Sequence, residues 1–175
     1  MSALVTRLEA TIRDIPDFPK PGILFKDITP ILKDPALMTA LIARMGEPWR
    51  DAGIDVVVGM ESRGFLFGTP LALGLGVAFV PARKPGKLPY KSIGFEYDLE
   101  YGTNRLEMHI DAIQPGQRVL VVDDLLATGG TAAATCKLVE KLGGEVVACC
   151  FVVELGFLGG RGKLGGVKVD SVVVY

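Results

Sequence analysis

Two short apolar runs, each followed by a stretch with helical character, constrain the fold of this chain most. Residues 54–60 and 119–122 are nearly all apolar, which is typical of strands that are covered on both faces. Strands that alternate with helices in this way lie parallel in one sheet. The apolar runs 146–153 and 172–175 add two strand candidates. The sequence therefore predicts an α/β fold with a parallel sheet flanked by helices.

The length and the N-terminal region indicate one domain with an added arm. A chain of 175 residues, of which 49% are hydrophobic, can bury one substantial core. An apolar helical stripe runs through residues 4–12, and the proline-rich residues 16–22 end it. Asp34 before Pro35 then predicts the start of a second helix.

Charge and composition argue against several partners and locations. The 19 basic and 20 acidic residues nearly cancel, so we expect no binding to nucleic acid or to an anionic membrane. Residues 64–82 carry no charge, but Pro70 and Pro81 interrupt them, and we expect no membrane span. The three cysteines lack the paired spacing of a zinc site, and the N-terminus mixes charged with apolar residues. We therefore expect a cytoplasmic protein with reduced thiols.

The strongest chemical signal is the segment 119–131, where an apolar strand leads into two carboxylates, a loop of small residues and a helix. Open parallel sheets bind ligands beyond the carboxyl ends of their strands, which is where Asp123 and Asp124 stand in the sequence. Carboxylates in this position can accept hydrogen bonds from the hydroxyls of a ribose. The alternative is an ordinary strand-to-helix turn whose two acids form a solvated cap.

The loop after these acids has the composition of a phosphate site. Gly129 and Gly130 allow the backbone to approach a ligand closely, and free N–H groups at the start of the next helix favour a phosphate. Thr128 and Thr131 add hydroxyl donors. Together with Ala127, these residues predict a sugar-phosphate site that uses no lysine.

This segment resembles the phosphoribosyl pyrophosphate (PRPP) motif of type I phosphoribosyltransferases, and nearly the whole chain is similar to the adenine phosphoribosyltransferases. The similarity also rests on five further motifs, which are DFPKPG at 17–22, FKDI at 25–28, SRGF at 62–65, RKPGKLP at 83–89 and LEYG at 99–102. The resemblance implies the fold of that family as a single domain spanning residues 1–175. Its parts would be an N-terminal hood (roughly 1–35), a core (roughly 36–175) and a mobile lid loop (roughly 83–101).

The resemblance also implies the reaction and its partners. Such enzymes join adenine to the ribose of PRPP, so that AMP forms and pyrophosphate leaves, by a Mg²⁺-dependent substitution at the C1′ carbon. PRPP carries the Mg²⁺, and no direct metal ligands are expected from the protein. Asp123, Asp124 and residues 127–131 would hold the ribose and the 5′-phosphate. A homodimer is implied as well.

The resemblance assigns the pyrophosphate of PRPP to two segments. Ser62 and Arg63 directly follow the strand predicted at 54–60, and in the family the peptide bond before this serine is often cis. Arg63 would act as a catalytic clamp, and cations of the lid would meet the charge that develops on the departing pyrophosphate. Taken alone, Arg63 is a surface arginine and the lid is a solvated basic loop. The lid cations are Arg83, Lys84 and Lys87.

Glu100, in the LEYG motif, is the residue that the resemblance places at the purine. Adenine loses the proton on N9 when N9 bonds to the ribose, or takes a proton at N7 when it leaves, and a carboxyl group shielded from water can mediate either transfer. We therefore expect Glu100 to be the catalytic acid or base. The alternative is that Glu100, like Glu96, Asp98 and Glu107, is a solvent-facing residue of a hairpin.

The resemblance assigns adenine recognition to one segment and an opposite wall. Leu24, Phe25 and Lys26 would contact the base through apolar packing and backbone hydrogen bonds, and Leu155 would lie opposite. The family commonly has arginine where this chain has Lys26, so the fork-like hydrogen bonding of a guanidinium is lost there. Ala127 stands where hypoxanthine-guanine enzymes carry an aspartate, which favours adenine.

Two alternatives and one misleading motif remain. A related enzyme could act on hypoxanthine, guanine or xanthine, and a regulatory protein could bind PRPP without catalysis. The latter usually carries an added DNA-binding region, for which this chain has neither spare length nor a basic helix. Residues 160–165 match the letter of a dinucleotide-binding motif, but too little chain follows for the rest of that unit, and we expect a surface turn there.

Overall fold

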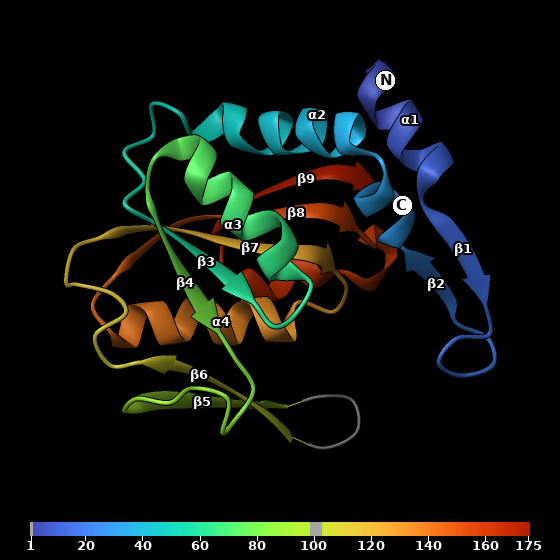
Figure 1. Cartoon of the computed structure of the whole chain (residues 1–175). Helices are drawn as coiled ribbons and strands as arrows, with labels where there is room; N and C mark the ends of the chain where they lie inside the picture. Colours follow the sequence, from blue (N-terminus) through green and yellow to red (C-terminus); the bar gives the residue numbers. More distant parts are fainter. Residues whose placement is uncertain (1, 99–102) are drawn as a thin grey trace.

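A parallel sheet forms the centre of the protein in a computed structural model that describes residues 2–98 and 103–175. Within these residues the sheet has five strands in the order β4-β3-β7-β8-β9, and every neighbouring pair is parallel (Figure 1). The predicted α/β class with a parallel sheet is confirmed. The strands are β3 (Val56–Met60), β4 (Ala78–Ala82), β7 (Arg118–Leu126), β8 (Glu145–Glu154) and β9 (Lys168–Val174).

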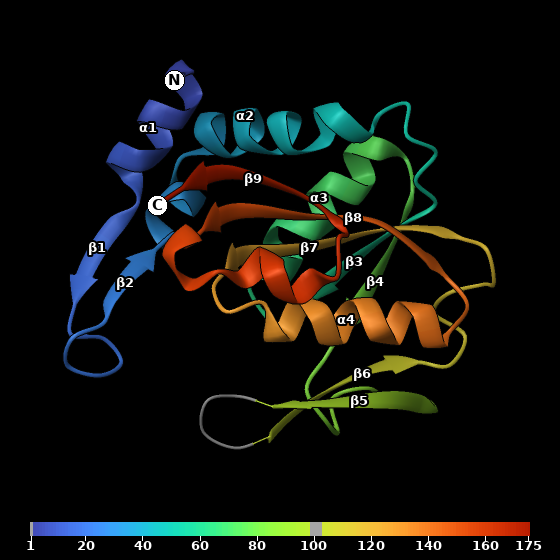
Figure 2. The ribbon, with the colours of Figure 1, turned by 180° about the vertical axis from the view of Figure 1, so that it is seen from behind.

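Helices cover both faces of this sheet. Two of them lie on one face and α4 lies on the other, where a two-stranded hairpin of β5 and β6 packs against its outer side (Figures 1 and 2). The helices are α2 (Pro35–Gly46), α3 (Gly64–Leu75) and α4 (Gly130–Lys141), and the hairpin strands are β5 (Ser92–Asp98) and β6 (Thr103–His109).

The core follows from the alternation of side chains along the strands. In β7, Leu120 and Val122 join the cluster beneath α2 and α3, whereas Val119 and Val121 join the cluster beneath α4. All four side chains are fully buried. A strand covered on both faces has to be apolar throughout, which is why the sequence shows a continuous run instead of an alternating one.

The N-terminal arm stands beyond the carboxyl ends of the sheet strands (Figure 1). It consists of α1 (Ala3–Thr11) and an antiparallel pair, β1 (Arg13–Pro16) and β2 (Leu24–Asp27). The predicted helix start that follows it is confirmed, because Asp34 Oδ1 accepts a hydrogen bond from the backbone N–H of Leu37 at 2.9 Å. Short 3₁₀ turns complete the chain: η1 (Thr29–Lys33), η2 (Glu47–Trp49), η3 (Gly156–Leu158) and η4 (Gly160–Leu164).

The uncharged segment 64–82 forms two separate elements. It contains α3, with Pro70 inside the helix, and then β4. Gly76 ends the helix in the left-handed conformation, with φ of 70°. Among residues 2–98 and 103–175, no helix is both long enough and apolar enough to cross a bilayer.

Candidate active site

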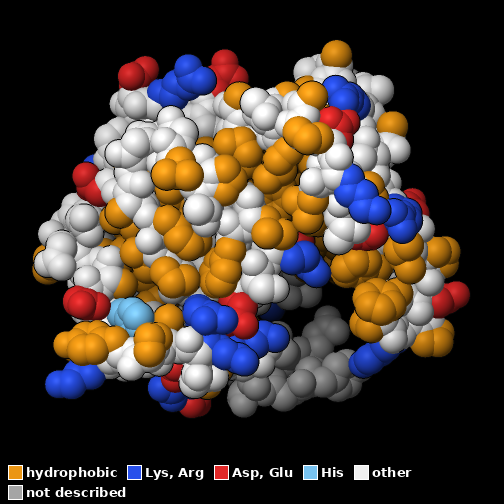
Figure 3. Space-filling view, in the orientation of Figure 1, with side chains coloured by type: hydrophobic (Ala, Val, Ile, Leu, Met, Phe, Trp, Pro, Cys, Tyr) orange, Lys and Arg blue, Asp and Glu red, His pale blue; other side chains and the backbone are white. Residues whose placement is uncertain are grey.

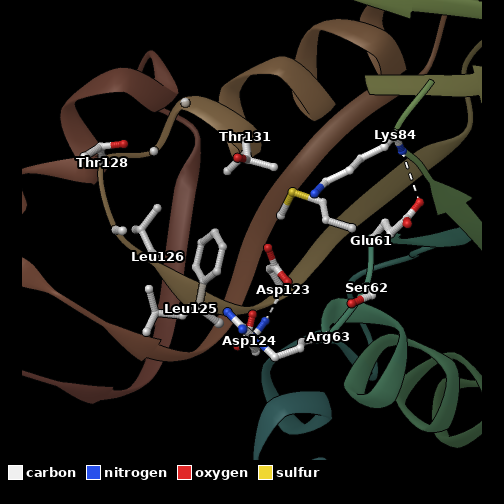
Figure 4. Close-up of a pocket in the computed structure, with 16 residues that line it drawn as sticks. Glu61, Ser62, Arg63, Lys84, Asp123, Asp124, Leu125, Leu126, Thr128 and Thr131 are labelled. Carbon is white, nitrogen blue, oxygen red and sulfur yellow. Dashed lines mark hydrogen bonds and ion pairs between the residues drawn. The ribbon is translucent and has the colours of Figure 1, made fainter. Parts of the chain in front are cut away.

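A cavity of about 420 Å³ lies where β3 and β7 end, at the carboxyl edge of the sheet (Figure 4). This is the position at which open parallel sheets bind ligands, and the volume suits a small molecule. The structure brings two predicted groups together here, the acids with their glycine-rich loop and part of the predicted pyrophosphate set. The predicted residues that line the cavity are Ser62, Arg63, Lys84, Asp123, Asp124, Ala127, Thr128, Gly129, Gly130 and Thr131.

The two acids lie inside β7, so the expectation that they follow the strand is wrong. Pairing of β7 with β3 ends at Val122, but pairing with β8 continues to Leu126. The apolar run stops at Asp123, where pairing with β3 has ended and the side chains of β7 begin to line the cavity. The acids therefore stand on a rigid strand that projects past β3, which fixes their positions.

The phosphate loop (residues 127–131) joins β7 to α4. Gly129 has φ of 81° and lies at the cap position of α4, a left-handed conformation that favours glycine. The first N–H groups of α4 have no partner within the helix, so they are available to an anion. The hydroxyl of Thr131 lies 3.2 Å from the hydroxyl of Tyr97, which ties this loop to β5.

The acids differ in their surroundings. Asp124 is buried and forms an ion pair with Arg63, whose Nε lies 2.5 Å from Asp124 Oδ2. The side chain of Asp123 points into the cavity (Figure 4) and accepts a hydrogen bond from the backbone N–H of Asp124 at 2.9 Å. Burial, and after it the neighbouring charge of Asp124, raises the pKa of Asp123 well above its ordinary value.

This raised pKa predicts that Asp123→Asn stabilises the ligand-free protein, increasingly so at higher pH. The folded state binds the proton of Asp123 more tightly than the unfolded state, so this group lowers stability as the pH rises from about 3.8 through the folded pKa. Asparagine keeps an acceptor for the N–H of Asp124 without the charge. We expect the Tm difference between variant and wild type to be small at pH 4 and clearly positive at pH 8, by calorimetry.

The matched control for this measurement is Asp51→Asn, which changes an exposed aspartate outside the cavity. Its Tm difference from wild type is expected to stay near zero at both pH values. A lower Tm for Asp123→Asn at pH 8, or an offset that does not change with pH, would contradict the assigned burial penalty.

The residues predicted for pyrophosphate are arranged around Glu61, an acid for which the sequence predicted no role. The peptide bond between Glu61 and Ser62 is cis, as the resemblance led us to expect. Glu61 Oε2 accepts hydrogen bonds from Arg83 Nε at 3.0 Å and from the backbone N–H of Lys84 at 3.1 Å. The side chain of Lys84 points into the cavity (Figure 4), whereas Arg83 and Lys87 are not part of its lining.

Glu61 therefore organises the start of the predicted lid. Burial alone would raise its pKa, but the hydrogen bond from Lys84 and the guanidinium of Arg83 together lower it. Arg83 also donates to the carbonyl of Lys87 at 3.0 Å, which closes a small turn. The signal in the sequence was an acid directly after an apolar strand, the same signal that identified Asp123.

The residues predicted for adenine lie outside the lining of this cavity. Leu24 and Phe25 belong to β2 of the arm, and the Arg63 guanidinium lies 5.7 Å from the centre of the Phe25 ring. Leu155 follows β8 and donates its backbone N–H to the carbonyl of Leu126 at 2.9 Å. The arm thus approaches Arg63, which lines the cavity, through Phe25.

The side chain of Lys26 has structural partners of its own. Its Nζ lies 2.6 Å from Asp14 Oδ1 and 3.8 Å from the centre of the Tyr175 ring. These contacts join both strands of the arm to the end of the β9 segment. The side chain of Lys26 therefore contacts Asp14 and Tyr175, and its backbone groups are the part of the residue that a base could bind.

Glu100, the expected acid or base, lies outside the described residues. The hairpin considered as an alternative does exist, since β5 and β6 pair from Ser92 with His109 to Asp98 with Thr103. Residues 92–98 of the predicted lid (roughly 83–101) therefore form a paired strand. Glu96 of this hairpin is exposed and lies 3.6 Å from Arg105 in an ion pair.

Comparisons with known proteins agree with this architecture. Residues 29–170 match the phosphoribosyl transferase domain family. An adenine phosphoribosyltransferase of Methylococcus capsulatus is 60% identical over 97% of this chain and 99% of its own length. The crystal structure of the enzyme of that name from Thermoanaerobacter pseudethanolicus superposes with a TM-score of 0.95 at 53% identity, over 98% of this chain and 99% of that one. A Saccharomyces cerevisiae adenine phosphoribosyltransferase, solved with adenine and an imino-altritol bisphosphate, gives a TM-score of 0.92 at 44% identity, covering 98% and 99% of the two chains.

Proposed function

The chain belongs to the phosphoribosyltransferase family and, within it, to the adenine phosphoribosyltransferases, and from this premise we infer that it converts adenine and PRPP to AMP and pyrophosphate. This reaction is a pentosyl transfer of purine salvage. The observation that supports the assignment to a site is the cavity itself, which is lined by three acids, a glycine-rich loop and two cations. The roles of the individual residues given below are proposals.

The proposed mechanism is a substitution at the C1′ carbon of PRPP. The phosphate loop holds the 5′-phosphate on its N–H groups, and Asp123 and Asp124 accept the ribose hydroxyls. The bond from C1′ to N9 of adenine forms while the bond from C1′ to the pyrophosphate oxygen breaks, and its electron pair leaves with pyrophosphate. Arg63 and Lys84 stabilise the charge that grows on this leaving group, because they meet it more strongly in the transition state than in the substrate.

The remaining lid cations act from the edge of the site. Arg83 donates hydrogen bonds to Glu61 and to the backbone carbonyl of Lys87. Closure of the lid over bound PRPP would add their charges to the pyrophosphate and exclude water from C1′. Ser62 contributes a hydroxyl and its backbone, which line the cavity.

Adenine is proposed to bind between the arm and the wall at Leu155. Phe25 offers a ring for stacking, and the backbone of residues 24–26 offers hydrogen bonds to the base edge. The proton on N9 passes to Glu100 as the bond to C1′ forms. Ala127 provides no carboxylate to contact the base. This disfavours a purine that needs an acidic partner and leaves adenine as the favoured base.

The donor set of the cavity fits a Mg²⁺ that enters with PRPP. Among residues 2–98 and 103–175, no cluster of three or more histidine, cysteine, aspartate or glutamate side chains is arranged to hold a metal ion. Asp123 and Asp124 are proposed to bind the ribose hydroxyls, so the phosphates of PRPP would hold the Mg²⁺, which commonly binds through substrate phosphates. When bound with PRPP, Mg²⁺ would neutralise part of the charge on the pyrophosphate.

A cytoplasmic homodimer is the proposed form of the enzyme. The three cysteines are free thiols in the structure, which suits a reducing compartment. Hydrophobic side chains gather over α3 and β4 on the face shown in Figure 3. On α3, Leu66 is 45% exposed and Leu73 is 77% exposed, so this face offers apolar surface to a second copy.

The proposed reaction predicts AMP formation from adenine, PRPP and Mg²⁺ by the purified protein. Hypoxanthine and guanine, assayed in parallel, are expected to give little or no nucleotide, since the base site is proposed to recognise adenine. Chromatography of the nucleotide products measures both outcomes. Turnover of hypoxanthine or guanine in preference to adenine would reassign the substrate, and binding of PRPP without turnover of any base would indicate a sensor instead of an enzyme.

A further inference from the structure

The turn between β8 and β9, formed by η3 and η4, lies against the beginning of α4 (Figure 2). This turn contains the glycine-rich stretch 160–165 that resembles a dinucleotide-binding motif, and the proposed reaction gives it no role. Leu164 at its end is 4% exposed and belongs to the same core cluster as Ala132 of α4. The turn is therefore packed into the protein next to the phosphate loop.

Two glycines make the contact between this turn and the phosphate loop. A Cβ atom built on Gly129 would lie 2.3 Å from the carbonyl oxygen of Gly160. A Cβ atom built on Gly160 would lie 2.2 Å from the carbonyl oxygen of Ala127 and 3.2 Å from the nitrogen of Gly129. The two backbones thus touch directly, with no room for a side chain between them. The turn thus supports the phosphate loop from a position that is not part of the cavity lining.

An ion pair between Arg161 and Glu154 fixes the turn between β8 and β9. Arg161 donates to both carboxylate oxygens of Glu154, from Nε at 2.6 Å and from Nη2 at 2.7 Å, and to the carbonyl of Val169 at 3.0 Å. Ser171 donates to the same carboxylate at 2.6 Å. Glu154 is the last residue of β8 and is 4% exposed. The guanidinium of Arg161 therefore connects the turn to the last residue of β8 and to the edge strand β9.

On the basis of the proposed function, we propose that Gly160, fixed by the ion pair of Arg161 with Glu154, is a positioning residue that sets the phosphate loop for the 5′-phosphate. N–H groups bind a phosphate well only if they already point at it, because reorientation at each binding event costs affinity. The loop is rich in small residues, and the contact of the Thr131 hydroxyl with Tyr97 restrains only its last residue. The turn supplies the missing constraint through backbone contact.

The test compares Gly160→Ala with Gly162→Ala in the same turn. A Cβ on Gly160 has to displace the backbone of the phosphate loop, whereas a Cβ on Gly162 meets nothing within 4 Å. Isothermal titration calorimetry measures the Kd of ribose 5-phosphate and of AMP, which carry the 5′-phosphate, and of pyrophosphate with Mg²⁺, which does not. Circular dichroism and a melting curve establish that each variant is folded.

We expect Gly160→Ala to raise the Kd of ribose 5-phosphate and AMP by about tenfold to a hundredfold, since small misplacements of binding groups cost this much. The Kd of pyrophosphate is expected to stay within about twofold of wild type. Gly162→Ala should leave all three unchanged. This selectivity separates positioning of the loop from general loosening of the fold, which would weaken every ligand.

Arg161→Lys is the second variant and decides the question if Gly160→Ala does not fold. Lysine keeps the charge but cannot make the paired hydrogen bonds to Glu154. We therefore expect the Kd of ribose 5-phosphate and AMP to rise, by less than in Gly160→Ala, and the Kd of pyrophosphate to stay nearly unchanged. Equal weakening of all three ligands, or unchanged 5′-phosphate affinity in a folded variant, would overturn the inference. Failure of the wild-type protein to bind ribose 5-phosphate would overturn the proposed function and the inference with it.

Discussion

Glu100→Gln is expected to lower kcat by about 10²-fold to 10⁴-fold, the usual contribution of a positioned acid or base, while the Kd of PRPP changes little. Glutamine has nearly the shape of glutamate but cannot take the proton that leaves N9 of adenine. Binding of PRPP depends on the acids and the loop at the end of β7, which this change does not alter. The loss therefore belongs to the chemical step.

The matched control is Glu96→Gln, which removes an acid from β5, four residues before Glu100 in the sequence. The side chain of Glu96 is 70% exposed and pairs with Arg105 at 3.6 Å, an arrangement that contributes little to stability. Steady-state kinetics should give wild-type kcat for Glu96→Gln. Similar and small losses in both variants would mean that Glu100 is one of several solvated hairpin acids.

Single-turnover measurements with excess enzyme separate this effect from product release. If Glu100 moves the proton, Glu100→Gln slows AMP formation within the first turnover. If the variant forms AMP at the wild-type rate and only later turnovers are slow, release limits the variant and the assignment of the acid or base is wrong.

The parts of the fold that the sequence predicted are those encoded over a few neighbouring residues. A strand buried on both faces needs consecutive apolar residues, and Asp34 caps α2 through a partner three residues away. The strand lengths were harder to predict because they depend on neighbours. The sequence alone cannot reveal that β7 continues past Val122, since that continuation depends on pairing with β8. The strand predicted at 172–175 begins earlier, at Lys168, for the same reason.

In the candidate site, too, the residues that the sequence predicted are close together in the chain, and those it missed depend on distant partners. The acids and the phosphate loop form one continuous segment, so their composition identified them together. No role was predicted for Glu61 or Gly160, because their contacts are with residues that are distant in the sequence, such as Arg83 for the first and Ala127 for the second. Lys26 was tied to the base by resemblance, but its side chain pairs with Asp14.

Asp124→Asn is expected to raise the Kd of PRPP by about tenfold to a hundredfold, the range that the loss of a charged hydrogen bond implies, with a smaller effect on kcat. Asp124 is proposed to accept a ribose hydroxyl, and it also holds Arg63 at 2.5 Å. The side chain of Arg63 is 46% exposed, so water can solvate it when its partner loses the charge. The variant should therefore fold.

The control for stability is Asp170→Asn, which removes a carboxylate from β9. Asp170 accepts two hydrogen bonds from Arg44, both at 3.1 Å, so this substitution weakens a partly buried ion pair away from the cavity. We expect it to lower Tm without changing the Kd of PRPP. A parallel loss of PRPP affinity in Asp170→Asn would mean that reduced stability, and not the lost ribose contact, explains the result for Asp124→Asn.

Whether Asp124 binds the ribose itself or only aims Arg63 is decided by a double-mutant cycle with Arg63→Ala. If the carboxylate acts only through Arg63, Asp124→Asn has no further effect once the guanidinium is gone. If it accepts a ribose hydroxyl, affinity falls again in the double variant. AMP sharpens the distinction because it keeps the ribose but lacks the pyrophosphate that Arg63 is proposed to meet. We expect Asp124→Asn to weaken AMP binding and Arg63→Ala to leave it nearly unchanged, and the reverse order would assign the ribose contact to Arg63.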